Sequence, residues 1–306
     1  MSSTTIDPGA IPRERSRRLD VLQDWLPRIV LAPSFAIVLL FVYGFILWTV
    51  YLSFTHSRMM PDYTLVGLDS YFRLFAQPSW WMAMKNIAIF GVFYVGICIG
   101  LGLLLAILLD QRIRMEGALR TIYLYPMAIS FIVTGTAWKW FLNPGLGIEK
   151  TMHDWGWASF HFDWLINPDM AIYTVVIAGA WQATGFCMAM FLAGLRGIDG
   201  EVLKAAQIDG ASGYHVYKRI IIPTLRPVFL SAFIVLTHMA IKSYDLVIAL
   251  TDGGPGNATE LPSTFMYSYT FTRDQMSVGA ASAVIMLMTV AAIIVPYLYS
   301  ELRERG

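Results

Sequence analysis

The sequence predicts an all-α, polytopic membrane protein with six transmembrane helices and one short helical segment in a connecting loop. Of its 306 residues, 57% are hydrophobic and only 14% are charged, whereas soluble domains usually carry about 25% charged residues. The apolar residues are also grouped into six stretches, each long enough to supply the roughly 20 residues that a span needs. Because backbone polar groups cannot stay unpaired in lipid, we expect every stretch to be helical.

The six stretches define a simple domain organisation. A polar, arginine-bearing segment, 1–28, precedes the first span. That span is too long for a signal-peptide core and has no cleavage site after it, so we expect it to be retained. A six-helix domain over 29–299 contains the long polar loop 196–226, and a tail follows at 300–306. The predicted spans are Ile29–Phe54, Asn86–Leu109, Leu119–Phe141, Ala171–Leu195, Val228–Leu250 and Val278–Tyr299.

The distribution of lysine and arginine predicts the orientation of these spans. Fifteen such residues fall in the two termini and in the loops after the second and fourth spans, and six fall in the other loops. Cytoplasmic loops carry the excess of positive charge. We therefore expect both termini and the loop 196–226 to be cytoplasmic. The net charge of +1 gives no bulk attraction to nucleic acid.

The loop 196–226 carries signals for two short helices. Asp199 is a suitable N-cap, and Glu201 suits the positive end of a helix. Gly210 ends that helix, since glycine readily adopts the left-handed conformation after a last turn. Ser212 can cap a second helical stretch, which Pro223 then breaks or kinks.

A helix this short is marginal in water by itself. It must be held by the rest of the chain, by the membrane surface or by another protein. Val202, Ala206 and Gly210 recur at every fourth position, so they form a line of small side chains that would fit a groove. The loop could equally be a plain amphipathic connection, and the residues alone leave both interpretations open.

Two spaced motifs resemble those of a known family. Lys204-Ala205-Ala206, then Gly210 after three residues and Ile220-Ile221-Ile222-Pro223 after nine more, resembles the EAA loop of ABC importer permeases, with lysine in place of the glutamate and Ile222 in place of a leucine. The stretch LTDGGPGNATELPSTFMYSYTF, Leu250–Phe271, resembles a segment of the larger-type permease of sugar importers of the maltose, glucose or glycerol-3-phosphate type. Asp252 stands there in place of glycine.

The resemblance implies a multi-pass permease of a bacterial-type inner membrane. It would form a translocation path with a second permease, usually a different chain, and would work with two copies of a separate ATPase and an external substrate-binding protein. ATP and Mg would bind to the ATPase, so no cofactor is expected in this chain. The residues expected at the ATPase contact or anchoring the loop are Glu201, Lys204, Ala205, Ala206, Asp209, Gly210, Ile220 and Pro223, and Gly253, Gly254 and Pro255 are expected in an external loop.

Polar residues inside the predicted spans are candidates for the substrate path. Lys242 and Asp245 are three residues apart, so on a helix they could pair on one face. Such a pair could fix helix packing or line the path, where Tyr244 could stack on a sugar. Trp181 and Gln182 in the fourth predicted span are further candidates. The sugar itself is not specified by these residues.

Other classes of function lack their signals. The chain has no phosphate-binding GxxxxGK[ST] loop, and its five histidines show no metal-ligand spacing, so we expect no metal site. Cys98 and Cys187 lie in apolar stretches and are expected to be inert. An ion-coupled secondary transporter using Lys242 and Asp245 remains the main alternative. A membrane-embedded enzyme would need a convergent catalytic cluster, which is not apparent.

Overall fold

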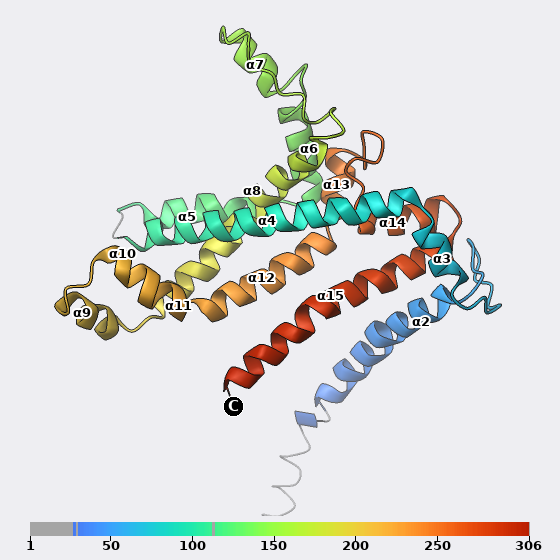
Figure 1. The fold of residues 1–306 in the computed structure, drawn as a ribbon, viewed down its shortest axis with the longest axis horizontal. Helices are drawn as coiled ribbons and strands as arrows, with labels where there is room; N and C mark the ends of the chain where they lie inside the picture. Colours follow the sequence, from blue (N-terminus) through green and yellow to red (C-terminus); the bar gives the residue numbers. More distant parts are fainter. Residues whose placement is uncertain (1–26, 29, 112–113, 306) are drawn as a thin grey trace, which may run out of the picture. The chain divides into compact units, whose positions relative to one another are not determined.

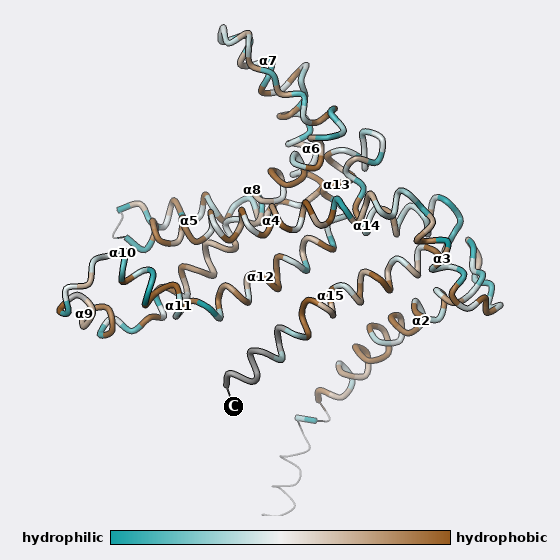
Figure 2. Tube along the Cα trace, in the orientation of Figure 1, coloured by the Kyte–Doolittle hydropathy of each residue, from teal (hydrophilic) through white to brown (hydrophobic). Residues whose placement is uncertain are grey.

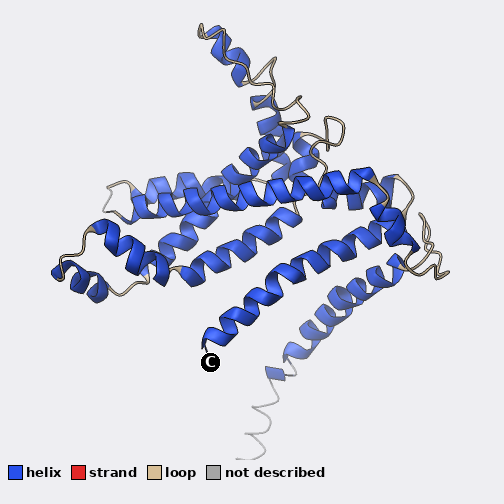
Figure 3. Ribbon diagram, in the orientation of Figure 1, coloured by secondary structure: helices blue, strands red, loops and turns tan. Residues whose placement is uncertain are grey.

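The structure is a computed structural model that describes residues 27–28, 30–111 and 114–305 of the chain. These ranges form helices and loops without a β-strand (Figures 1 and 3), apart from one isolated bridge between Thr55 and Leu65. The chain separates into two compact units, Met1–Tyr51 and Leu52–Gly306. The predicted all-α class is confirmed.

The first unit carries most of the first predicted span. Val30–Ser53 is long and apolar enough to cross a membrane. It includes a π-helical turn, η1 at Leu39–Tyr43, followed by α2 at Gly44–Ser53. Apolar side chains such as Leu40 and Leu47 are more than two-thirds exposed, because a single helix has no core of its own. Nearly all of the predicted N-terminal segment, including Arg13, Arg15, Arg17 and Arg18, lies outside the described residues.

The core of the second unit is built on two long helices, α4 at Pro78–Asp110 and α8 at Ala171–Arg196. The short helix α3, Asp69–Phe75, precedes α4. One face of α4 is buried at Phe90, Tyr94, Cys98, Gly102 and Ala106, which follow the near-fourfold spacing of a helix face. At Gly102 the two helices approach so closely that an added Cβ would lie 2.5 Å from the Cβ of Cys187.

The third predicted span is not one continuous helix. The chain forms α5 at Glu116–Leu124, a 3₁₀ turn (η2) at Tyr125–Ala128 and α6 at Phe131–Phe141, and the two parts are bent by 100°. Pro126 lies in the turn and cannot donate a backbone hydrogen bond. Ser130 then caps α6 by accepting a 3.3 Å hydrogen bond from the backbone N–H of Val133.

The fifth predicted span is also interrupted. α12 runs over Arg226–Ile241, and α13 begins only at Asp245 and ends at Leu250. Before α12, the chain passes through α10 at Gly213–Val216, η3 at Tyr217–Ile221 and α11 at Ile222–Thr224. This preceding stretch meets α12 at a bend of 60°. The predicted span Val228–Leu250 is therefore not one continuous helix: α12 begins within two residues of the predicted start but ends at Ile241.

The C-terminal part forms a second apolar cluster. α14 at Pro262–Tyr267 and the π-helical η4 at Ser268–Thr272 precede the long helix α15, Met276–Arg305. Trp80, Phe265, Tyr269 and Val278 are at most 1% exposed in this cluster. Phe265 and Tyr269 stack with ring centroids 4.0 Å apart.

The span count agrees with the predicted six when the bends are taken into account. Four helices of the described chain are long and apolar enough to cross a membrane, and the total rises to six if each of two bent pairs is one span. Figure 2 shows that α4, α12 and the first part of α15 are rich in hydrophobic residues, whereas the outer end of α7, Ile148–Asp154, carries more polar ones.

Candidate functional site

The helix in the loop 196–226 is α9, Gly200–Ile208. Asp199 stands just before it, and its Oδ1 accepts a 2.9 Å hydrogen bond from the backbone N–H of Glu201. This is the N-cap arrangement that the sequence predicts. Glu201 also forms an ion pair with Lys204, at 2.9 Å between Oε1 and Nζ, and both side chains are well exposed. An exposed pair of this kind contributes only about 0.3–0.5 kcal/mol to helix stability.

The C-terminal end of α9 is closed by a glycine. Gly210 has a φ of +76°, in the left-handed region that favours glycine. The backbone N–H of Ala211 donates a 3.0 Å hydrogen bond to the carbonyl of Ala206, which is the bond of a Schellman motif. The helix therefore begins and ends at defined residues, and the predicted turn at Gly210 is confirmed.

The helix does not present the face that the spacing of small residues suggests. Ala206 is only 8% exposed and belongs to the core of this chain, with Leu203 packed beside it. The outward surface instead carries Val202, 47% exposed, and Ile208, 86% exposed. The prediction that Val202, Ala206 and Gly210 insert together into a groove of a partner is therefore wrong, because Ala206 is already buried in the core of the second unit.

The second half of the loop fastens it to the bundle. Val216, Ile221 and Leu225 are buried in the main core, and Ile220 packs against it. Pro223 is exposed and lies within α11, just before the bend into α12. Arg196, at the end of α8, forms an ion pair with Glu116 of α5, with 2.5 Å between its Nη2 and the Oε1 of Glu116. The loop is thus attached at both ends, while α9 projects at the end of the unit opposite α3 and α14 (Figure 1).

A second candidate site is a cavity of about 300 Å³ beside the segment 251–260. The predicted residues Tyr244 and Gly253 line it. The rings of Tyr244 and Tyr267 line its wall, with their centroids 4.9 Å apart. The remaining lining residues are Ile248, Asp252, Asn257, Glu260, Thr264, Ser268, Thr272 and Arg273.

The segment 251–260 is a tightly turned loop. Asp252, Gly253, Gly256 and Asn257 all have positive φ. The hydroxyls of Thr251 and Thr259 are 2.7 Å apart, and the Thr259 hydroxyl also donates to the carbonyl of Gly254 at 3.0 Å. The predicted loop residues Gly253, Gly254 and Pro255 therefore lie in an internally bonded turn, and Gly253 lines the cavity.

Glu260 is the cavity residue that the sequence does not reveal. It is 5% exposed, and its Oε2 has no hydrogen-bond partner among the described residues. Burial raises the pKa of this carboxyl above its ordinary value, and the nearby Arg273 cation opposes the shift. Its backbone carbonyl accepts a 3.0 Å hydrogen bond from Asn86 of α4. The sequence predicts an exposed side chain for a glutamate in a loop rich in glycine and proline, and its burial goes with long-range packing such as this contact with α4.

Lys242 and Asp245 do not share a helix face. Both are exposed and flank the break between α12 and α13, and no ion pair between them is found in the described structure. The hydroxyl of Ser263 in α14 donates a 2.9 Å hydrogen bond to the Ser243 carbonyl in the break. The pairing expected from a continuous helix is wrong, because the helix ends at Ile241.

The two candidates in α8 have different environments. Trp181 is 42% exposed and meets Trp138 edge to face, with ring centroids 5.8 Å apart. Gln182 is 3% exposed, and its Nε2 donates a 2.6 Å hydrogen bond to the carbonyl of Ile129. Gln182 thus supports the bend between α5 and α6. Neither residue lines the cavity beside Tyr244.

Comparisons with known proteins give the family. Residues 98–304 match the binding-protein-dependent transport system inner membrane component. The xylose/arabinose import permease protein XacH of Haloferax volcanii is 35% identical over 89% of this chain and 86% of its own. The trehalose/maltose transport system permease protein MalF of Thermococcus litoralis is 30% identical over 88% of this chain and 91% of its own.

A solved structure shares the fold. It is the crystal structure of a bacterial ABC transporter involved in the import of the acidic polysaccharide alginate, with a TM-score of 0.80 and 20% identity over 95% of this chain and 99% of that one. The family model matches about two-thirds of the sequence. The matched range contains the apolar helices α8 and α12, nearly all of α15 and the hydrogen-bonded segment 251–260. The chain therefore belongs to the binding-protein-dependent transport system inner membrane components, and it is a transport permease subunit rather than an enzyme.

Proposed function

We propose that the chain is a permease subunit of an ATP-driven sugar importer. In this assignment it forms the translocation path with a second permease, works with two copies of an ATPase that binds ATP and Mg, and receives sugar from an external binding protein. The chain itself needs no cofactor. The relatives named for xylose, arabinose, trehalose and maltose support sugars as the substrate class.

The observation that carries the coupling role is the exposed apolar edge of α9. Ile208 is 86% exposed on a helix that is capped at both ends and attached to the core through Ala206. An isoleucine in this position gains by burial against another protein, at about 25 cal/mol per Å² of apolar surface. Val202, Ala205, Asp209 and Gly210 are also exposed, and with Ile208 they form the proposed ATPase contact.

The cavity beside the segment 251–260 supports the substrate class. Tyr244 and Tyr267 offer aromatic faces, while Asp252, Asn257 and Glu260 offer hydrogen-bonding oxygens. This combination suits the apolar faces and the hydroxyl groups of a sugar. We assign the cavity to the substrate path, together with the exposed groups at Lys242 and Asp245. Trp181 remains a candidate on a separate surface.

Ion-coupled transport is not favoured. It relied on a Lys242–Asp245 pair within one helix, and the helix is broken between them. The proposed localisation is an inner membrane with both termini and α9 on the cytoplasmic side, which follows from the distribution of positive charge.

The experiment compares Ile208→Asp with Ile208→Leu in cells that depend on this importer. We expect Ile208→Asp to lower ATP-driven sugar uptake at least tenfold without reducing the amount of chain in the membrane, because the side chain lies outside the chain's own core. Ile208→Leu keeps an apolar surface and should transport normally. Ala206→Trp is a poor probe, since it would disturb the core directly.

Normal uptake by Ile208→Asp would contradict the coupling contact. Uptake that persists after ATP depletion but collapses with the ion gradient would contradict the ATP-driven assignment as a whole. A panel of labelled pentoses, hexoses and disaccharides in the same assay tests the substrate class.

A further inference from the structure

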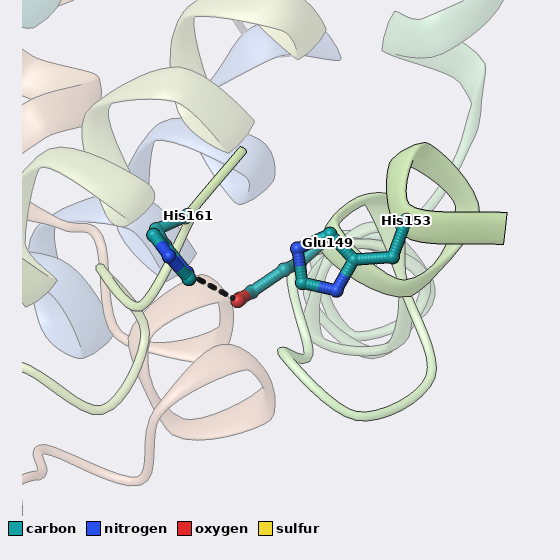
Figure 4. Close-up of side chains that lie close together, drawn as sticks. All are labelled: Glu149, His153 and His161. Atoms are coloured by element: carbon teal, nitrogen blue, oxygen red, sulfur yellow. Dashed lines mark hydrogen bonds and ion pairs between the residues drawn. The ribbon is translucent and has the colours of Figure 1, made fainter. Parts of the chain in front are cut away.

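Three potential metal ligands meet near α7. Glu149 and His153 lie one turn apart in this helix, and His161 returns to them from the following loop (Figure 4). One ligand atom from each of the three side chains lies within 4.8 Å of the other two. The Nδ1 of His161 is 3.2 Å from the Oε1 of Glu149. The imidazole rings of His153 and His161 have centroids 5.9 Å apart and are nearly perpendicular.

The backbone of the returning loop holds this arrangement. The Nε2 of His153 donates a 2.7 Å hydrogen bond to the carbonyl of Phe160, the residue next to His161. The backbone N–H of Phe162, on the other side, donates to the Oε2 of Glu149 at 3.3 Å. Gly156, with a φ of +92°, reverses the chain between helix and loop. Both neighbours of His161 are therefore tied to the other two members of the cluster.

The donor set matches a transition-metal site. Two imidazoles and one carboxylate are a ligand combination of Zn²⁺, which binds histidine nitrogen at about 2.0–2.1 Å and carboxylate oxygen at about 2.0–2.2 Å. Ligand atoms around such an ion lie about 3.3–3.5 Å apart. The longest separation, up to 4.8 Å, must therefore shorten by about 1.3–1.5 Å to close the site. The His161 side chain is 75% exposed, so its rotation meets little resistance, whereas Glu149 is 14% exposed and already placed.

We propose that Glu149, His153 and His161 bind one divalent transition-metal ion, with Zn²⁺ as the expected occupant and water completing the coordination. The carbonyl of Phe160 orients the His153 ring, as a hydrogen-bonded outer partner does in known metal sites. The ion would tie α7 to the loop 155–161 and would make this lobe rigid. The proposal does not depend on the transported substrate, and it departs from the absence of a metal site expected from the histidine spacing.

The test measures zinc binding by the full chain, purified in detergent with its accompanying subunits and with an affinity tag free of histidine. Competition against a chromophoric zinc chelator gives the affinity and the stoichiometry. We expect one zinc ion per wild-type chain, and at least a tenfold weaker affinity in His161→Ala and in Glu149→Gln. His215→Ala is the matched control, because His215 is an exposed histidine away from α7, with its ring beside Ser212 and Tyr214.

A second measurement separates a metal site from a nonspecific effect of zinc. Wild-type chain loaded with Co²⁺ should show the visible absorption of a low-symmetry site, and His161→Ala should lose it while keeping the elution volume of a folded complex. Zinc should also slow proteolysis within residues 155–161 in the wild type but not in His161→Ala. Equal zinc affinity in wild type and His161→Ala, or no binding by the wild type, would overturn the proposal.

Discussion

At the scale of single residues, Glu260 combines a charge with an environment that disfavours it. Its side chain is 5% exposed, and one carboxylate oxygen has no partner among the described residues. Burial of an incompletely bonded carboxylate costs free energy of folding. Proteins retain such a destabilising group where it binds a ligand. Glu260 lines the cavity that also contains Tyr244 and Tyr267.

The raised pKa of Glu260 predicts a pH dependence of stability. Below its ordinary pKa of 4.5, the carboxyl is protonated in both the folded and the unfolded chain. Its ionisation then does not change the free energy of unfolding. As the pH rises from there through the raised pKa of the folded state, only the unfolded chain releases its proton freely. The wild type therefore loses stability in this window. Glu260→Gln removes the group and should remove that loss.

The measurement is the thermal midpoint of both proteins in detergent at pH 4 and at pH 8. The thermal midpoint of Glu260→Gln, relative to that of the wild type, should be higher at pH 8 than at pH 4. Asp62→Asn is a useful control, since hydrogen bonds from Thr64 lower the pKa of this exposed carboxyl. A difference that stays constant with pH for Glu260→Gln would rule out the raised pKa.

At the scale of the elements, glycines determine where helices meet and where they stop. Gly185 in α8 faces the C-terminal end of α5, and an added Cβ would lie 1.9 Å from the carbonyl oxygen of Tyr123. Gly210 closes α9 in the left-handed conformation, with open space around it. The first glycine is needed for its small size and the second for its backbone, so substitutions at the two positions should fail in different ways.

Gly185→Ala should destabilise the second unit. The contact is with backbone, which cannot rotate away, so α5 and α8 must separate at an overpacking cost of roughly 1–3 kcal/mol. Gly96→Ala is the matched control in a membrane helix, because no described residue outside its own helical turn lies within 4 Å of the added Cβ. Thermal unfolding in detergent should show a lower midpoint for Gly185→Ala only. Equal midpoints would mean that the close approach does not exist.

Gly210→Ala should weaken coupling while leaving the core intact. An L-residue forced to a φ of +76° is strained by about 1–2 kcal/mol, and Gly210→Pro is worse because proline holds φ near −65°. Sugar uptake should fall in the order glycine, asparagine, alanine, proline, since asparagine tolerates the left-handed region best after glycine. Gly200→Ala, at the start of α9 in open space, should transport normally. If uptake by the variants does not follow this order, the conformation at Gly210 is not needed for the transport cycle.

At the scale of the whole molecule, local signals predict more than long-range ones. The all-α class, the apolar stretches, the Asp199 cap and the Gly210 turn depend on neighbouring residues, so the sequence is enough to predict them. The breaks at Tyr125–Ser130 and at Lys242–Tyr244 lie inside stretches that are apolar overall, so the mean hydropathy of each stretch does not reveal the bend. The burial of Ala206 and Glu260 depends on contacts with distant segments. The meeting of His161 with Glu149 depends on how the loop after α7 folds back. Neither could be predicted from spacing.

The orientation of the whole chain is open to a direct test with single cysteines. The native Cys98 and Cys187 are fully buried, so they give little background labelling. Ser159→Cys in the lobe after α7 and Lys218→Cys in η3 both place the thiol at an exposed position. The distribution of positive charge predicts that the region around Lys218 is cytoplasmic and that the lobe lies outside. A membrane-impermeant maleimide should therefore label Ser159→Cys in intact cells, and Lys218→Cys only after the membrane is opened. The reverse pattern would place α9 on the outside, where no ATPase could reach Ile208, and the coupling role would be lost with it.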